Sequence, residues 1–224
     1  MIIKVCGMRE PENILAVSRL GVDMIGFIFY PKSSRYVPLQ IEKEQVMRDS
    51  MRCSSDNVVL RVPRRVGVFV NDTPQNILMR VNAHQLDYVQ LHGEETPASI
   101  EELKTILTND NHRDVRFLKA LSINNKEDFR VWRDYQGLVD MLLFDTRCTT
   151  YGGSGKHFEW SLLDAYDGDI PFLLSGGIGP GDADQIRSIH HPMMAGVDLN
   201  SRFESAPAVK NVEKLNSFIQ ELGF

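Results

Sequence analysis

The strongest constraint on this chain is an eightfold alternation of short apolar runs with segments of helical character. The runs are rich in Val, Ile, Leu and Phe, which is typical of parallel strands that are buried on both faces. We expect strands at residues 2–5, 24–29, 66–70, 88–91, 115–120, 139–144, 171–174 and 195–198.

Helix signals fill the segments between these runs. A proline follows Glu10, Thr73 and Thr96 at the first helical position, and each threonine is suited to cap the helix that it precedes. We expect helices at residues 13–20, 42–51, 75–83, 98–107, 126–135, 160–166, 182–189 and 209–222.

Strict alternation of this kind indicates a parallel sheet with crossover helices. Eight units in 224 residues, about 28 residues each, fit a compact (β/α)8 TIM barrel, an α/β fold, with one domain over residues 1–224. A doubly wound open sheet is the alternative. It is disfavoured because no GxGxxG turn follows the first run.

Charge and composition exclude several classes of protein. A formal net charge of −5 argues against a general affinity for nucleic acid. The apolar runs are too short for a membrane helix, and the N-terminus does not have the pattern of a signal peptide. The three cysteines are an odd and sparse set, which suits free thiols in a reducing compartment. We therefore expect a cytoplasmic protein that does not bind membranes, and the ligand spacings predict no metal site.

Two reactive side chains stand at the ends of predicted strands, which in a parallel barrel form the active-site face. Cys6 ends the first run before Gly7, and Asp145 ends the sixth. A thiol in such a pocket can have a lowered pKa and act as a nucleophile or base, although a buried cysteine can equally be a small apolar side chain. A carboxyl group at an apolar strand end can stay protonated and donate a proton. The alternative for Asp145 is a cap or a salt bridge with Arg147.

Glycine-rich loops follow the last three predicted strands. Loops after the seventh and eighth strands of a barrel often bind phosphate through backbone N–H groups. The loop after the sixth strand suggests a third close approach to a ligand. The residues concerned are Gly155, Gly176, Gly177, Asn200 and Ser201. We therefore expect a phosphorylated small molecule as the ligand.

Other polar residues allow two interpretations each. Arg35, after the second strand, is either a surface charge or a fork for a carboxylate. Gln90 and His92 either line the pocket or bond to loop backbone, and the second is slightly favoured. Lys119 faces either the pocket or the helices, and alternation alone does not decide between them.

Together these segments resemble the phosphoribosylanthranilate isomerase family over nearly the whole chain. The motifs that carry the resemblance are Lys4-Val5-Cys6-Gly7-Met8, Ser34-Arg35-Tyr36, Val89-Gln90-Leu91-His92-Gly93-Glu94, Gly152-Gly153-Ser154-Gly155, Ser175-Gly176-Gly177 and Gly196-Val197-Asp198.

The resemblance implies a barrel that acts without a metal or organic cofactor, as a monomer or homodimer. It implies an Amadori rearrangement of N-(5-phosphoribosyl)anthranilate to 1-(2-carboxyphenylamino)-1-deoxyribulose 5-phosphate in tryptophan biosynthesis. Asp145 would then open the furanose ring as general acid, and Cys6 would remove the C2′ proton as general base. Arg35 would hold the anthranilate carboxylate. The remaining substrate contacts would come from Gly155, Gly176, Gly177, Asn200 and Ser201.

The chain departs from the family's pattern after the eighth strand. Arg202 stands where the family has a glycine, and residues 206–211 replace a Pro-Gly-x-Lys-Asp stretch, although Glu204 and Lys210 remain. Arg202 would either join the phosphate site or face solvent beside Glu204.

Three rival functions are left open. A histidine-pathway isomerase would use two aspartates, and Cys6 speaks against it. An indole-glycerol-phosphate synthase would need lysine acid chemistry, for which Lys119 alone is thin support. A non-catalytic phosphate-binding barrel would have no use for both Cys6 and Asp145.

Overall fold

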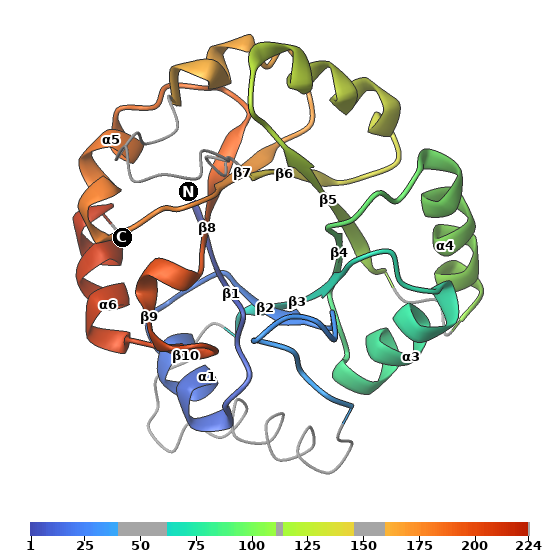
Figure 1. The fold of residues 1–224 in the computed structure, drawn as a ribbon, viewed down its shortest axis with the longest axis horizontal. Helices are drawn as coiled ribbons and strands as arrows, with labels where there is room; N and C mark the ends of the chain where they lie inside the picture. Colours follow the sequence, from blue (N-terminus) through green and yellow to red (C-terminus); the bar gives the residue numbers. More distant parts are fainter. Residues whose placement is uncertain (40–61, 111–113, 146–159, 224) are drawn as a thin grey trace.

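Eight parallel strands close into a barrel in a computed structural model that describes residues 1–39, 62–110, 114–145 and 160–223. Each strand pairs with its neighbours in the sequence, and β1 also pairs with β8, so the sheet closes on itself (Figure 1). The strands are β1 (Ile2–Cys6), β2 (Met24–Ile28), β3 (Arg64–Phe69), β4 (Tyr88–Leu91), β5 (Arg116–Ser122), β6 (Met141–Asp145), β7 (Phe172–Ser175) and β8 (Met194–Leu199).

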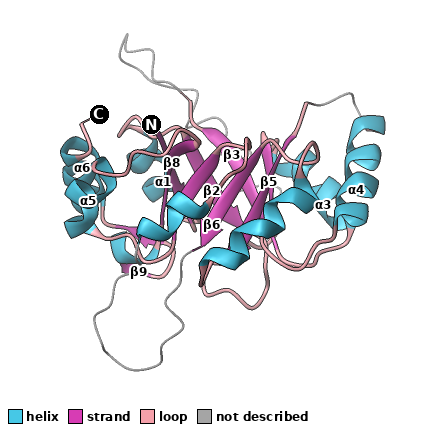
Figure 2. Cartoon of the chain, turned by 90° about the horizontal axis from the view of Figure 1, so that it is seen from above, coloured by secondary structure: helices cyan, strands magenta, loops and turns pink. Residues whose placement is uncertain are grey.

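Helices surround the strands on the outside of the barrel (Figure 1) and flank them on both sides in the view of Figure 2. The α-helices are α1 (Pro11–Ser18), α3 (Pro74–His84), α4 (Pro97–Asn109), α5 (Ala183–Arg187) and α6 (Val212–Glu221). The 3₁₀-helices are η1 (Lys126–Tyr135), η2 (Trp160–Ala165), η3 (Pro180–Asp182) and η4 (Ser201–Phe203). Among the helices that the structure describes, none is long and apolar enough to cross a membrane.

The predicted barrel is confirmed, and each predicted strand lies within two residues of an observed one. The two threonine caps are also present. The Thr73 hydroxyl accepts a hydrogen bond from the Asn76 amide and the Thr96 hydroxyl accepts one from the Ser99 amide, both at 3.3 Å. The helix expected at residues 42–51 lies outside the described residues.

The helix expected to begin at Val209 is wrong at its start. Val209 and Lys210 form strand β10 (Val209–Lys210), which pairs antiparallel with β9 (Glu204–Ala206) in a small hairpin. The helix begins only at Val212, because Asn211 caps it by accepting a hydrogen bond from the Lys214 amide at 2.9 Å. The hairpin therefore follows the eighth strand directly, beside the mouth of the barrel.

Alternation along the strands separates an inner set of side chains from an outer set. The outer set packs against the helices, and Lys119 belongs to it because its strand neighbours Phe117 and Leu121 lie in that outer cluster. The Lys119 Nζ lies 3.0 Å from Glu95 Oε2, on the helix side of the sheet. The inner set is Met24, Val66, Tyr88, Leu118, Ala120, Met141, Leu143 and Leu173. The question that alternation left open for Lys119 is thus settled in favour of the helices.

Candidate active site

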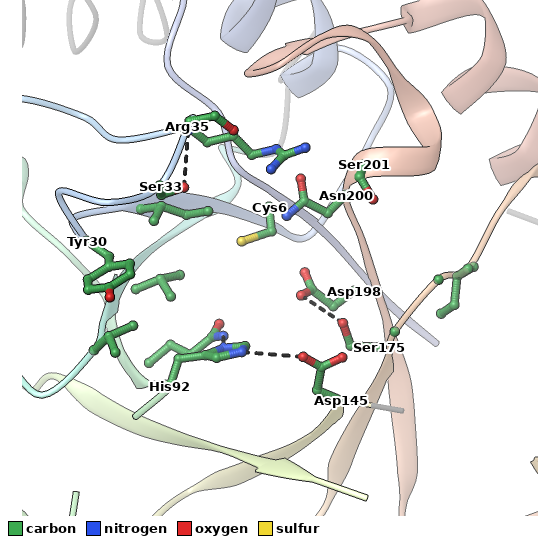
Figure 3. A pocket seen from close by; sticks show the side chains of 18 residues that line it. Cys6, Tyr30, Ser33, Arg35, His92, Asp145, Ser175, Asp198, Asn200 and Ser201 are labelled. Atoms are coloured by element: carbon green, nitrogen blue, oxygen red, sulfur yellow. Dashed lines mark hydrogen bonds and ion pairs between the residues drawn. The ribbon is translucent and has the colours of Figure 1, made fainter. Parts of the chain in front are cut away.

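A cavity of about 520 Å³ opens where the strands end. This volume suits a small molecule of the size of a phosphorylated sugar with a ring attached. Figure 3 shows side chains from opposite walls of the barrel converging on the cavity. The strand residues that line it are Cys6, Ile28, Val68, Gln90, Asp145, Ser175 and Asp198. Cys6 and Asp145, which the sequence predicted to meet, therefore do line one cavity.

Cys6 lies in the barrel wall with its thiol in a space that a glycine leaves open. Its neighbour on β2 in the register is Gly26, and a Cβ at that position would lie only 2.8 Å from the Cys6 Sγ. Burial raises the pKa of the thiol, and the nearby Lys4 ammonium only partly offsets this shift. The prediction of a lowered pKa is therefore wrong, because desolvation of the thiolate outweighs the surrounding cations.

A buried ion pair that the sequence analysis missed lies below the thiol. Lys4, two residues before Cys6 on the inner face of β1, places its Nζ 2.8 Å from Asp198 Oδ1 on β8. Burial opposes the ammonium, but Asp198 outweighs it and raises the pKa of Lys4. The other Asp198 oxygen lies 3.4 Å from the Ser175 hydroxyl (Figure 3). A lysine in an otherwise apolar run, in phase with Cys6, was the signal that could have found it.

Asp145 faces the cavity from the end of β6 and lies near a histidine from the loop after β4, two strands away in the barrel. The Nε2 of His92 lies 3.5 Å from Asp145 Oδ2 (Figure 3). The Nδ1 of the same ring lies 2.9 Å from the Gln90 Nε2. With the Gln90 amide nitrogen as the donor, the ring takes the tautomer in which Nε2 carries a proton towards Asp145. The slightly favoured expectation that Gln90 and His92 serve loop backbone is wrong, since both line the cavity.

Arg35 also lines the cavity, but part of its fork is already occupied. Its Nε and Nη2 lie 2.8 and 2.6 Å from the two carboxylate oxygens of Glu204. Lys210 donates to the same Glu204 carboxylate at 2.6 Å and to Asn200 Oδ1 at 2.8 Å. Hydrogen bonds to Glu204 raise the pKa of Arg35. Although burial opposes it, bonds from Arg35 and Lys210 lower the pKa of Glu204.

The loops after β7 and β8 line the side of the cavity expected to bind phosphate. Gly176 and Gly177 have φ values of 96° and 71°, a region that favours glycine and lets backbone N–H groups approach an anion. Asn200 and Ser201 follow β8 and line the cavity with them. Arg202 is exposed and is not among the residues that line it. Gly155 lies outside the described residues.

The cavity has an apolar wall opposite these loops. Ile28, Tyr30, Val68 and Val70 form it, next to Arg35. This arrangement offers a surface for a ring, with a cation at its edge. Within the described ranges, the structure contains no cluster of three or more His, Cys, Asp or Glu side chains that could hold a metal ion.

Comparison with known proteins shows the family of this chain. The family described as "PRAI: N-(5'phosphoribosyl)anthranilate (PRA) isomerase" matches residues 3–221. An N-(5'-phosphoribosyl)anthranilate isomerase of Parabacteroides distasonis is 48% identical over 222 residues, which cover 99% of this chain and 93% of the relative. The enzyme of the same name from Phocaeicola vulgatus is 43% identical over 224 residues, covering 99% and 98%.

Solved structures give the same result. The crystal structure of phosphoribosyl anthranilate isomerase from Thermotoga maritima is similar with a TM-score of 0.76 and 32% identity, covering 99% of this chain and 98% of that one. A structure of the isomerase in complex with reduced 1-(o-carboxyphenylamino)-1-deoxyribulose 5-phosphate has a TM-score of 0.71 and 30% identity, with the same coverage.

Proposed function

The chain belongs to the N-(5'-phosphoribosyl)anthranilate isomerase family, and we propose that its reaction takes place in the cavity between Cys6 and Asp145. The protein is an isomerase of tryptophan biosynthesis. It converts N-(5'-phosphoribosyl)anthranilate into 1-(2-carboxyphenylamino)-1-deoxyribulose 5-phosphate by an Amadori rearrangement. The observation that carries the choice of site is that a thiol and a carboxyl group face one cavity from β1 and β6.

The two groups divide the proton transfers between them. Asp145 donates a proton to the furanose ring oxygen while the C1′–O bond breaks, which leaves a Schiff base. The Cys6 thiolate then removes the proton from C2′, and the resulting enolamine tautomerises to the ketose product. The Nε2–H of His92, 3.5 Å from Asp145 Oδ2, stabilises the carboxylate that remains once Asp145 has given up its proton. No cofactor is needed, since one proton is given and one is taken without net oxidation.

The walls of the cavity suit the three parts of the substrate. The anthranilate ring packs on Ile28, Tyr30 and Val68, with its carboxylate at Arg35. The phosphate binds to the glycine loop after β7 and to the loop after β8. The substrate-binding residues of this proposal are Arg35, Gly155, Gly176, Gly177, Asn200 and Ser201.

Two further points are part of the proposal. One related structure comes from an enzyme of Thermotoga maritima that is described as dimeric, and we expect a monomer or a homodimer here. We also expect a cytoplasmic protein, because the three cysteines are an odd and sparse set that suits a reducing compartment. Sedimentation of the purified protein and fractionation of cells test these two expectations.

Turnover of freshly made substrate by the wild-type protein tests the proposal itself. Cys6→Ala is expected to lower kcat by roughly 10²-fold or more, the usual scale for loss of a general base, with little change in KM. Asp145→Asn, which preserves shape but cannot donate a carboxyl proton, is expected to bind substrate and fail at ring opening. A rate for Cys6→Ala close to the wild-type rate would remove the thiol from the mechanism.

A further inference from the structure

A single buried carboxylate connects Arg35, which lines the cavity, to Lys210, which lies behind the cavity wall. The Glu204 side chain is only 5% exposed, and it accepts hydrogen bonds from Arg35 and Lys210 at 2.6–2.8 Å. Arg35 comes from the loop after β2, whereas Glu204 begins the hairpin after β8. The contact therefore joins two loops on either side of Cys6.

The geometry of the Arg35–Glu204 pair determines which donors remain for a ligand. A guanidinium has five N–H groups, and Glu204 takes one on Nε and one on Nη2. The remaining N–H groups, two on Nη1 and one on Nη2, include the parallel pair at the end of the side chain. That pair matches a second carboxylate with two parallel hydrogen bonds. Glu204 thus holds the plane of the guanidinium while leaving its end available.

Lys210 extends the same control to Asn200. Its ammonium only donates, so its bond to Asn200 directs the amide oxygen towards Lys210 and leaves the amide nitrogen for the cavity. In Figure 3 the nitrogen of Asn200 lies on the side of Cys6. Two bonds hold Lys210 itself, since its backbone N–H and C=O pair with the Asn13 side chain of α1 at 2.7 and 2.8 Å.

The close packing of this network leaves no room at the residue after Cys6. A Cβ at Gly7, where φ is +75°, would lie 2.6 Å from Arg35 Cδ and 2.8 Å from Asn200 Oδ1. The network is therefore built against the backbone of the residue next to the proposed base.

We propose that Glu204 is a positioning residue that aims Arg35 at the substrate's carboxylate, an inference that rests on the role proposed above for Arg35. Glu204 does not touch the substrate. It holds Arg35 directly and Asn200 through Lys210, so the cavity selects a substrate with an acidic ring substituent at one end and phosphate at the other.

Two product analogues test this inference by calorimetry. One is the reduced 1-(2-carboxyphenylamino)-1-deoxyribulose 5-phosphate, and the other is its phenylamino counterpart without the carboxylate. In Glu204→Gln the preference for the first over the second is expected to fall by about tenfold, the scale of one misplaced hydrogen bond between charged groups. Glu204→Asp keeps the charge but withdraws it by one methylene, so it should fold and lose the same preference. A role in stability alone would weaken both analogues equally.

Glu95→Gln is the matched control, because Glu95 is also a buried carboxylate and is paired with Lys119 on the outer face of the barrel. It should leave the preference unchanged. The inference is overturned if Glu204→Gln and Glu204→Asp keep the wild-type preference for the carboxylate-bearing analogue. It is also overturned if this preference increases, because Glu204 would then compete with the substrate's carboxylate for Arg35. If Arg35 does not bind the substrate's carboxylate, the wild-type protein itself should bind both analogues equally. That result would overturn the role proposed for Arg35 and, with it, the role of Glu204.

Discussion

Two lysines in the barrel wall are almost equally buried and lie on opposite faces of the sheet. The side chain of Lys4 is 0% exposed and pairs with Asp198 at 2.8 Å, whereas that of Lys119 is 2% exposed and pairs with Glu95 at 3.0 Å. Lys119 also donates to the carbonyl of Gly93 at 2.7 Å, so it ties the loop after β4 to β5. Lys4 instead lies under the cavity beside Cys6.

The difference shows that the face of the sheet, not burial, decides what a charge does in this barrel. Removing two charges from water costs several kcal/mol on either face, so neither pair is strong evidence for stability. The outer pair recovers that cost by ordering a loop. The inner pair places a cation beside the thiol that we propose as the base, and the Lys4 ammonium lowers the pKa of that thiol. This effect on the thiol distinguishes the two regions.

Removal of either lysine is expected to have its largest effect on the free energy of unfolding, and this effect should be similar on the two faces of the sheet. Lys4→Met and Lys119→Met each leave a buried carboxylate without its cation, which costs about 3–5 kcal/mol. Urea denaturation of both variants measures this loss. A cost under about 1 kcal/mol for either one, the range of an exposed pair, would show that its carboxylate reaches water.

Activity should separate the two regions. With the Cys6 thiolate as the proposed base, kcat/KM is expected to rise with pH through the raised pKa of Cys6. Lys4→Met removes a cation that lowers this pKa, so the rise moves to higher pH and the rate at neutral pH falls roughly tenfold per pKa unit. Lys119→Met should keep the wild-type profile.

The rate of Cys6 alkylation as a function of pH provides a direct measurement of the same shift. It requires a protein in which Cys53 and Cys148 are replaced, since these thiols could react as well. Identical alkylation profiles for Lys4→Met and wild type would mean that Lys4 acts only on the fold.

The strands and the place of Cys6 and Asp145 in one cavity could be predicted because they depend on local patterns. Runs of β-branched residues fix the strands, and a strand end fixes the cavity side of Cys6 and Asp145. The face occupied by Lys119 could not be predicted, because its phase depends on how β5 pairs within the closed barrel. The pair of Arg35 with Glu204 could not be predicted either, because the two residues are 169 positions apart. Glu204 also belongs to a hairpin whose second strand has a sequence that predicts the start of a helix.

Replacing both members of the inner pair sharpens the comparison further. Lys4→Met with Asp198→Asn leaves no buried charge unpaired, so stability is expected to return to within about 1 kcal/mol of the wild type. The pH profile should return only in part, because Cys6 still lacks the Lys4 cation that lowers its pKa, although the Asp198 charge that raises this pKa has gone as well. Stability is measured by urea and the profile by kcat/KM from pH 6 to 10. If the profile returned completely to that of the wild type, the effect of Asp198 on the thiol would be as large as that of Lys4, and the cation alone would not control the thiol.

The smallest effect is expected from a cation that lies near the cavity but in solvent. Arg202 is exposed and does not line the cavity, while Glu204 is already paired with Arg35 and Lys210. Water and salt screen a charge in such a place, so it contributes little compared with Lys4. Arg202→Ala should therefore change KM by less than about twofold and leave its dependence on salt as it is in the wild type. A clear rise in KM, with weaker dependence on salt, would place Arg202 on the phosphate. Proximity to the cavity, rather than the face of the sheet, would then be enough to give a charge a function.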